Sequence, residues 1–224
     1  MSQAKSVERR FLLQPSWTQS TYRDRFESIR PYVKDRSVLD LGAGSGYFRN
    51  DWFHQLILDV ASEAVGVEMS NDFIEGALAK SGVQLVLGDA ETVRLERTFD
   101  VVFAGELIEH LSCFTGLLET AHAHLESGGR LVLTTPNAFA VSNFVYRFGG
   151  RALVHPEHTC WFCADTLSQL LERHKFKVVS VEYLAHTTPG TLRRLAAGAV
   201  RMLLPKRLAR NTLMVVAEPI FDDT

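Results

Sequence analysis

The feature that most constrains this chain is the alternation of short apolar runs with longer amphipathic segments. The short runs are rich in Val, Leu and Phe and are bounded by Gly, Asp, Pro or Asn, as strands are. The segments between them carry apolar residues at helical spacing. Strands that alternate with helices form βαβ units, whose right-handed crossovers give a parallel sheet covered on both faces. We expect strands at 37–41, 64–68, 83–87, 99–104, 130–135, 177–184 and 212–217, and helices at 18–33, 49–60, 71–80, 114–126 and 165–174.

The expected fold class is therefore α/β, doubly wound. The chain has 224 residues, 46% of them hydrophobic, which suits a single domain over residues 1–224 built around one core. Within it we expect an N-terminal helical cap at 1–36, an aromatic cover at 137–163 that is irregular over 137–150, and a basic amphipathic insertion at 187–210.

The net charge and the number of cysteines limit the class of protein and the compartment in which it works. The formal net charge is −2, whereas a protein held on nucleic acid by bulk charge needs many cations to neutralise phosphates. Three Cys cannot form a disulfide framework, which indicates a reducing compartment. The N-terminus shows no signal-peptide pattern, and no run approaches the ~18–20 apolar residues that span a bilayer. We therefore expect a cytoplasmic protein.

Three alternating glycines, Gly42, Gly44 and Gly46, follow the first strand in the sequence VLDLGAGSGYF. Glycine is needed where the backbone turns with positive φ, or where a ligand comes too close for a Cβ. Ligands of open α/β sheets bind at the carboxyl ends of the strands, so the loop predicts a ligand against bare backbone. Tyr47 stands where the third glycine of a dinucleotide fingerprint would fall, which disfavours a nucleotide-binding oxidoreductase.

Two acids stand at the same expected edge of the sheet. Glu68 ends the second strand, and Asp89 follows the third. A carboxylate can accept hydrogen bonds from ribose hydroxyls or from an adenine amino group. Each acid could instead cap a helix, but capping does not explain why both lie beside the glycines.

The ordered series VLDLGAGSGYF, VGVEMS, LGDAE, FDVVFAGELIEHL and LESGGRLVLTTPN resembles the class I S-adenosylmethionine (SAM)-dependent methyltransferases over residues 38–137. The resemblance implies a Rossmann-like, seven-stranded, mostly parallel sheet whose last strand is antiparallel. It also implies SAM as the cofactor. The residues that the resemblance assigns to cofactor binding are Asp40, Gly42, Ala43, Gly44 and Gly46 for the methionine part, Glu68 for the ribose, and Met69, Asp89 and Ala90 for the adenine.

The segment after the fourth strand, Glu106-Leu107-Ile108-Glu109-His110, borders the reacting methyl in such a fold. Methyl transfer needs alignment and, for a weak nucleophile, removal of a proton. The candidate catalytic residues are His110, as general base, and Glu106. Taking a proton from a phenol near pKa 10 costs an imidazole near pKa 6.5 about 5 kcal/mol, which a cation on the acceptor oxygen would lower.

A helix over this segment would place Glu106 on one face with Glu109 and His110. Two carboxylates and an imidazole can bind Mg²⁺ or Zn²⁺, and His155 or His158 could complete the shell. The pattern resembles the ExxEH of ubiquinone-pathway O-methyltransferases and the metal site of small-RNA 2′-O-methyltransferases. The expected metal ligands are Glu106, Glu109, His110 and His158; the alternative is a metal-free site in which Glu106 faces the cofactor.

Two later segments bear on the acceptor. Residues 137–151 are aromatic, which suits either a cover over an apolar acceptor or core packing. Residues 191–210 hold six cations and no acid, with apolar residues at helical spacing that Gly198 and Pro205 interrupt. Such a segment can lie on an anionic membrane or place a solvated face over the core. The single CxxC of Cys160 and Cys163 is a poor zinc pattern, and Cys163 falls at a helix N-cap.

The combined prediction is a SAM-dependent methyltransferase acting on an oxygen of a small apolar or lipid-linked acceptor, with peripheral membrane contact through 191–210. Two alternatives stay open: a metal-assisted RNA 2′-O-methyltransferase, which the sequence pI of about 6.4 disfavours, and a non-catalytic protein that binds a nucleotide cofactor. The sequence does not specify the oligomeric state.

Overall fold

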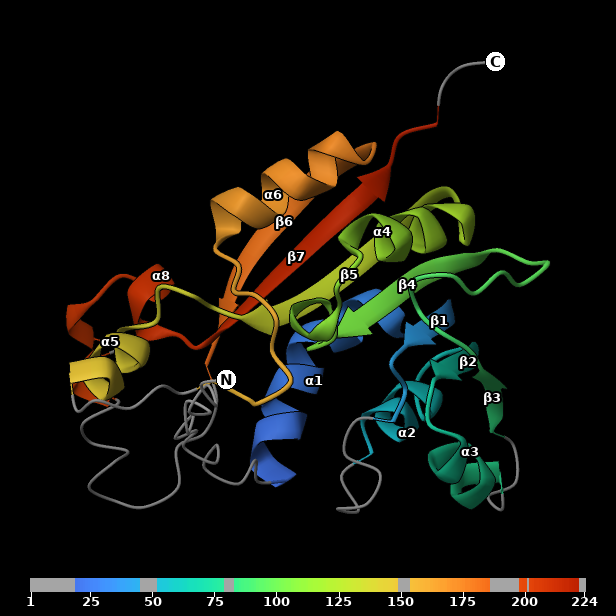
Figure 1. Ribbon diagram of the computed structural model, residues 1–224, viewed down its shortest axis with the longest axis horizontal. Coiled ribbons are helices and arrows are strands. Elements are labelled where there is room, and N and C mark those ends of the chain that lie inside the picture. Colours follow the sequence, from blue (N-terminus) through green and yellow to red (C-terminus); the bar gives the residue numbers. More distant parts are fainter. Residues whose placement is uncertain are drawn as a thin grey trace, which may run out of the picture.

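The computed structural model describes residues 19–44, 52–78, 83–148, 154–185, 198–200 and 202–221, with the backbone alone at 19–22, 78 and 146. A seven-stranded sheet in the order β3-β2-β1-β4-β5-β7-β6 runs through the molecule (Figure 1). β7 runs antiparallel to both of its neighbours, β5 and β6, and the other neighbouring strands pair in parallel. The strands are β1 Ser37–Leu41, β2 Glu63–Glu68, β3 Gln84–Leu87, β4 Phe99–Gly105, β5 Leu125–Pro136, β6 Phe176–Leu184 and β7 Thr212–Pro219.

The central strands are continuous apolar runs because helices cover both faces of the sheet. On one face, α1 and α2 pack Phe26, Ile29 and Phe53 onto the sheet. On the other face, Leu117 of α4 and Leu171 of α6 enter a second buried cluster. The helices are α1 Gln19–Val33, α2 Phe53–Leu58, α3 Asn71–Leu78, η2 Ile108–His110, α4 Phe114–Ala123, α5 Val141–Phe148, α6 Ala164–Arg173 and α8 Lys206–Ala209.

The expected doubly wound sheet with an antiparallel last strand is confirmed, and β5 is the main correction to the strands. It begins at Leu125 rather than at 130, so the helix expected over 114–126 ends at Ala123. The ladder to β4 shifts register between Phe99 and Val101. Gly128, with φ of 83°, lies in the extra length of β5, and a residue with a Cβ would be strained there.

The segment 137–150, expected to be irregular, instead contains the helix α5. Asn137 anchors its start, since the Asn137 side chain accepts from Phe139 N–H and donates to the carbonyls of Arg207 and Arg210. These bonds also join α5 to the region of α8, beside which it lies in Figure 1. The expected interruption at Pro205 is confirmed, because α8 begins after it. Residues 186–197, 201 and 45–51 lie outside the described residues.

None of the helices that the structure describes combines the length and the apolar character needed to cross a bilayer.

Candidate cofactor and acceptor site

The loop after β1 lies against the carboxylate that ends β2. Gly44 N–H donates to Glu68 Oε2 at 2.9 Å, and the N–H groups of Met69 and Ser70 donate to Oε1 at 2.9 and 3.1 Å. A Cβ on Gly44 would lie 2.6 Å from Glu68 Oε2, so a larger residue there would displace the Glu68 carboxylate. Gly42 has φ of 80°, a value that also favours glycine. The structure thus brings Gly42, Gly44 and Glu68 together, while Gly46 lies outside the described residues.

Asp40 lies beneath this loop and is bonded to a buried histidine. Its Oδ2 is 2.8 Å from His54 Nδ1, and both side chains are buried. Burial raises the pKa of Asp40, which the hydrogen bond and charge of His54 oppose. Asp40 therefore ties β1 to α2 through this buried contact.

Asp89 stands one strand away from Glu68. Glu68 is paired in register with Leu87, two residues before Asp89, so the two acids lie at neighbouring strand ends. Asp89 Oδ1 accepts from Glu91 N–H at 2.9 Å and so also caps a turn. Ala90 is buried in the core, and the side chain of Met69 is 72% exposed.

A small pocket opens next to the glycine loop, and sequence reasoning missed its charged residue. The pocket is lined by Arg25, Asp40, Gly42, Ala43, Phe53, Phe103 and Gly105. Arg25 is buried, and its Nη1 is 3.6 Å from Glu106 Oε1. Burial raises the pKa of Glu106, and the charge of Arg25 opposes the rise. The sequence does indicate that Arg25 is buried, because it shares one face of α1 with Ile29 and Val33 at a spacing of four residues.

The helix expected to place Glu106, Glu109 and His110 on one face is not present. Glu106 has φ of 54° and turns toward Arg25, and only a single 3₁₀ turn follows. Glu109 is buried and accepts from Thr135 Oγ1 at 2.9 Å. Burial, and then the charge of Glu106, raise the pKa of Glu109 well above its usual value. The structure therefore separates both carboxylates from the His110 ring.

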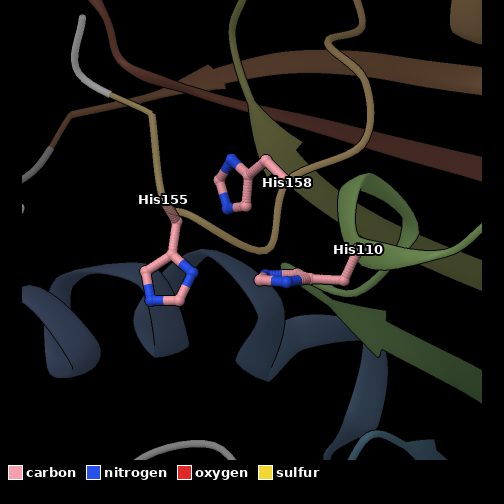
Figure 2. A group of neighbouring side chains, drawn as sticks. All are labelled: His110, His155 and His158. Atoms are coloured by element: carbon pink, nitrogen blue, oxygen red, sulfur yellow. The ribbon is translucent and has the colours of Figure 1, made fainter. Parts of the chain in front are cut away.

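His110 instead lies against His155 and His158, as Figure 2 shows. One ligand atom from each of the three side chains lies within 4.8 Å of the others, and no other such group of metal-ligating side chains occurs among the described residues. Burial, and then the charges of His110 and His155, lower the pKa of His158 to about 4. Burial, and then His155, also lower the pKa of His110, against the effect of Glu157. In both side chains the shift favours the neutral imidazole.

The two cysteines do not take part in this group. Cys163 is the N-cap of α6, as predicted, and its N–H donates to Thr166 Oγ1 at 3.2 Å. Cys160 packs partly buried against the core.

The strand order, the bare loop after β1 and the acid after β2 define a class I Rossmann-like methyltransferase fold. Residues 16–181 match a family model described as a methyltransferase domain. The chain belongs to this family and is of the class I SAM-dependent type, as its sequence motifs predicted.

Individual relatives differ in their acceptors. The chain is 28% identical over 175 residues to a tRNA U34 carboxymethyltransferase of Pseudoalteromonas atlantica, covering 73% of this chain and 52% of the relative. It is 30% identical over 122 residues to a mitochondrial ubiquinone biosynthesis O-methyltransferase of Candida albicans, covering 51% and 36%. The chain thus spans about half or less of the length of these relatives. A SAM-dependent methyltransferase from Archaeoglobus fulgidus shares the fold, with a TM-score of 0.64 at 21% identity over 90% of this chain and 94% of that chain.

Proposed function

We propose that this protein transfers the methyl group of SAM to an oxygen atom of a small apolar or lipid-linked acceptor. The observation that carries the proposal is the corner where the Gly44 backbone meets Glu68 beside the pocket of Arg25. SAM consists of a nucleoside and an amino-acid group joined through a sulfonium. The backbone of the glycine loop, the acids at the ends of two strands and the buried cation Arg25 complement these parts.

The charges of the pocket match the amino-acid end of SAM. The carboxylate of SAM would face Arg25, because the planar guanidinium group can donate two parallel hydrogen bonds to a carboxylate. Its ammonium would face Asp40 or Glu106, which lie near Arg25. Glu106 then positions Arg25 and the cofactor, and is not itself the base.

The nucleoside end would lie over the tips of β2 and β3. Each oxygen of Glu68 already accepts backbone N–H groups but keeps further acceptor capacity for a ribose hydroxyl. The exposed side chain of Met69 offers an apolar surface to the adenine ring. Asp89 and the backbone of Ala90 stand at the next strand end, where the adenine edge would reach them.

The acceptor would approach from the turn that carries His110. A Cβ on Gly42 would lie 3.1 Å from Leu107 Cδ1, so this turn begins beside the glycine loop. His110 is the group placed to meet the acceptor hydroxyl. The neutral imidazole can accept its proton, although the lowered pKa makes it a weaker base than an ordinary histidine.

An exposed apolar patch supports an acceptor that is apolar or carried in lipid. On α5, Phe144 is 51% and Phe148 is 94% exposed, and Met202 and Leu203 are similarly open. Exposed cations, Arg147, Lys206 and Arg207, stand in the same two regions. Exposed apolar side chains with cations nearby in the sequence are typical of a surface that rests on an anionic membrane.

The proposed contact with an anionic membrane is tested by vesicle sedimentation. We expect the protein to sediment with phosphatidylcholine vesicles that contain phosphatidylserine, and binding to fall about tenfold in Phe148→Ser, since burial of one aromatic side chain is worth about 1.5–3 kcal/mol. Binding that is equal for Phe148→Ser and wild type, or absent for both, would remove this part.

The activity is tested by incubating the protein with methyl-labelled SAM and the aqueous and lipid fractions of a cell extract. We expect a labelled lipid-soluble product whose label resists alkaline hydrolysis, as a methyl ether does. Glu68→Ala should lose most of the transfer, whereas the matched variant Glu75→Ala, an exposed acid on α3, should keep it. Label found only on RNA, or on nitrogen, would contradict the proposed acceptor.

A further inference from the structure

We propose that His110, His155 and His158 bind a divalent transition-metal ion of the Zn²⁺ type, with one coordination position left open toward the acceptor. The ligand set differs from the carboxylate-rich one that the sequence predicted, because Glu106 and Glu109 are turned away. The role of the ion in binding the acceptor rests on the proposed function; the ion site itself does not.

The geometry of the cluster is close to that of a metal site. The three ligand atoms lie within 4.8 Å of one another, and ligands about 2.0–2.1 Å from a tetrahedral Zn²⁺ stand about 3.4 Å apart. The ring centroids of His110 and His158 are 4.5 Å apart at an interplanar angle of 87°. Small rotations of the side chains would close the remaining distance.

The backbone holds the two halves of the cluster together. Thr159 N–H and Oγ1 donate to the Glu109 carbonyl at 2.8 and 3.1 Å, and Oγ1 also lies 2.6 Å from the Leu111 carbonyl. Thr159 thus fastens the segment of His155 and His158 to the turn of His110. His158 N–H donates to the His155 carbonyl at 3.1 Å, which closes a turn between these two ligands.

The chemistry of the cluster also favours a metal. Neutral imidazole is a common ligand of transition metals, and three imidazoles converge here. Imidazole suits Zn²⁺, Cu²⁺, Fe²⁺ and Ni²⁺, whereas Mg²⁺ prefers oxygen. Glu157 Oε2 lies 3.8 Å from His110 Nδ1 and 3.7 Å from His155 Nδ1, and so adds negative charge at the rim.

Three protein ligands leave a fourth position for a substrate oxygen. A hydroxyl bound there loses its proton more readily, which removes the need for a strong base. With the ion in place His110 is a ligand and no longer the base, so the O–H proton passes to water, and the oxygen electron pair forms the O–CH₃ bond. The S–CH₃ bond breaks with its electrons on sulfur, which yields S-adenosylhomocysteine. The acceptor class is then a phenol or an alcohol, best with a neighbouring oxygen.

The test uses the full chain without a histidine tag, stripped with EDTA and dialysed against Zn²⁺. We expect about one Zn²⁺ per chain by elemental analysis and a higher melting temperature with Zn²⁺. His155→Ala and His158→Ala should each weaken Zn²⁺ binding at least tenfold and abolish the thermal shift. The matched control is His174→Ala, a partly exposed histidine at the end of α6, which should bind Zn²⁺ as the wild type does.

SAM calorimetry on every variant separates the possible failures. Unchanged SAM affinity shows that a variant has folded, and His158→Gln provides a second, milder change should an alanine variant unfold. Zn²⁺ that fails to bind the wild type, or that binds the His155 and His158 variants equally well, would overturn the site. SAM binding without Zn²⁺ would leave the proposed function standing, whereas Zn²⁺ binding without methyl transfer would leave only the metal site.

Discussion

The cofactor side and the acceptor side of the sheet edge are built in different ways. On the cofactor side, backbone N–H groups, glycines and the buried ion pair of Arg25 and Glu106 create a rigid corner. On the acceptor side, a turn and a segment more than forty residues downstream bring together three partly buried histidines. We propose that the first side binds a cofactor that a whole class of enzymes shares. The second side would bind the acceptor, which varies among relatives.

This difference makes the two sides separable by mutation. A change on the cofactor side should alter SAM binding and leave Zn²⁺ binding intact, and a change on the acceptor side should do the reverse.

Arg25→Met should give the largest loss of stability. The change removes the buried partner of Glu106 and leaves that carboxylate uncompensated, at a cost of about 3–4 kcal/mol in the free energy of unfolding. Urea denaturation measures this cost. The double variant Arg25→Met, Glu106→Gln should recover most of the loss, and a single variant within about 1 kcal/mol of wild type would contradict the buried pair.

Gly44→Val should weaken SAM binding at least 100-fold, about 2.7 kcal/mol. Its side chain would occupy the space in which Glu68 meets the Gly44 backbone. The matched control is Gly198→Ala, where a Cβ meets nothing within 4 Å. Zn²⁺ affinity should be unchanged in both. If Gly44→Val bound SAM as wild type does in calorimetry, the cofactor would lie elsewhere.

Glu109→Gln should stabilise the protein at pH 8 by about 1–2 kcal/mol. The raised pKa of Glu109 means that its contribution to stability is present below the ordinary pKa of a glutamic acid and is lost as the pH rises through the folded pKa. Glutamine stays neutral and can still accept from Thr135. The advantage should disappear near pH 4 in urea unfolding. A variant that is less stable at pH 8 than wild type would show that the charged form is needed.

His158→Gln should reduce the loss of stability on acidification in EDTA. The unfolded histidine binds its proton near pH 6.5 and the folded one near 4, so stability falls as the pH is lowered between these values. The shift corresponds to about 3 kcal/mol, which solvent exposure should reduce to about 1 kcal/mol. Parallel pH profiles for variant and wild type would mean that His158 is not buried as described.

The sequence predicted that Gly44 and Glu68 come together, because both lie at the ends of neighbouring strands. The glycines lie next to one strand, and Glu68 and Asp89 end the next two, so the parallel order alone brings them to one edge. Arg25 was missed because its partner Glu106 lies eighty-one residues away in the sequence. A charged residue on an apolar helix face nevertheless indicates a buried ion pair.

The acceptor side was predicted only in part. Helical spacing placed Glu106, Glu109 and His110 on one face, but the positive φ of Glu106 breaks that periodicity. Thr159 holds His155 and His158 beside His110 through hydrogen bonds to the Glu109 and Leu111 carbonyls. No sequence pattern predicts these long-range hydrogen bonds. The aromatic composition of 137–150 hides the helical spacing of α5.

The most direct measurement is calorimetric titration of the wild-type chain with SAM and, separately, with NADH. The account predicts saturable binding of SAM at one site per chain, no binding of NADH, and a clear loss of SAM affinity in Glu68→Ala but not in Glu75→Ala. Tight binding of NADH, or SAM affinity that does not depend on Glu68, would contradict the assignment of this corner to a sulfonium nucleoside.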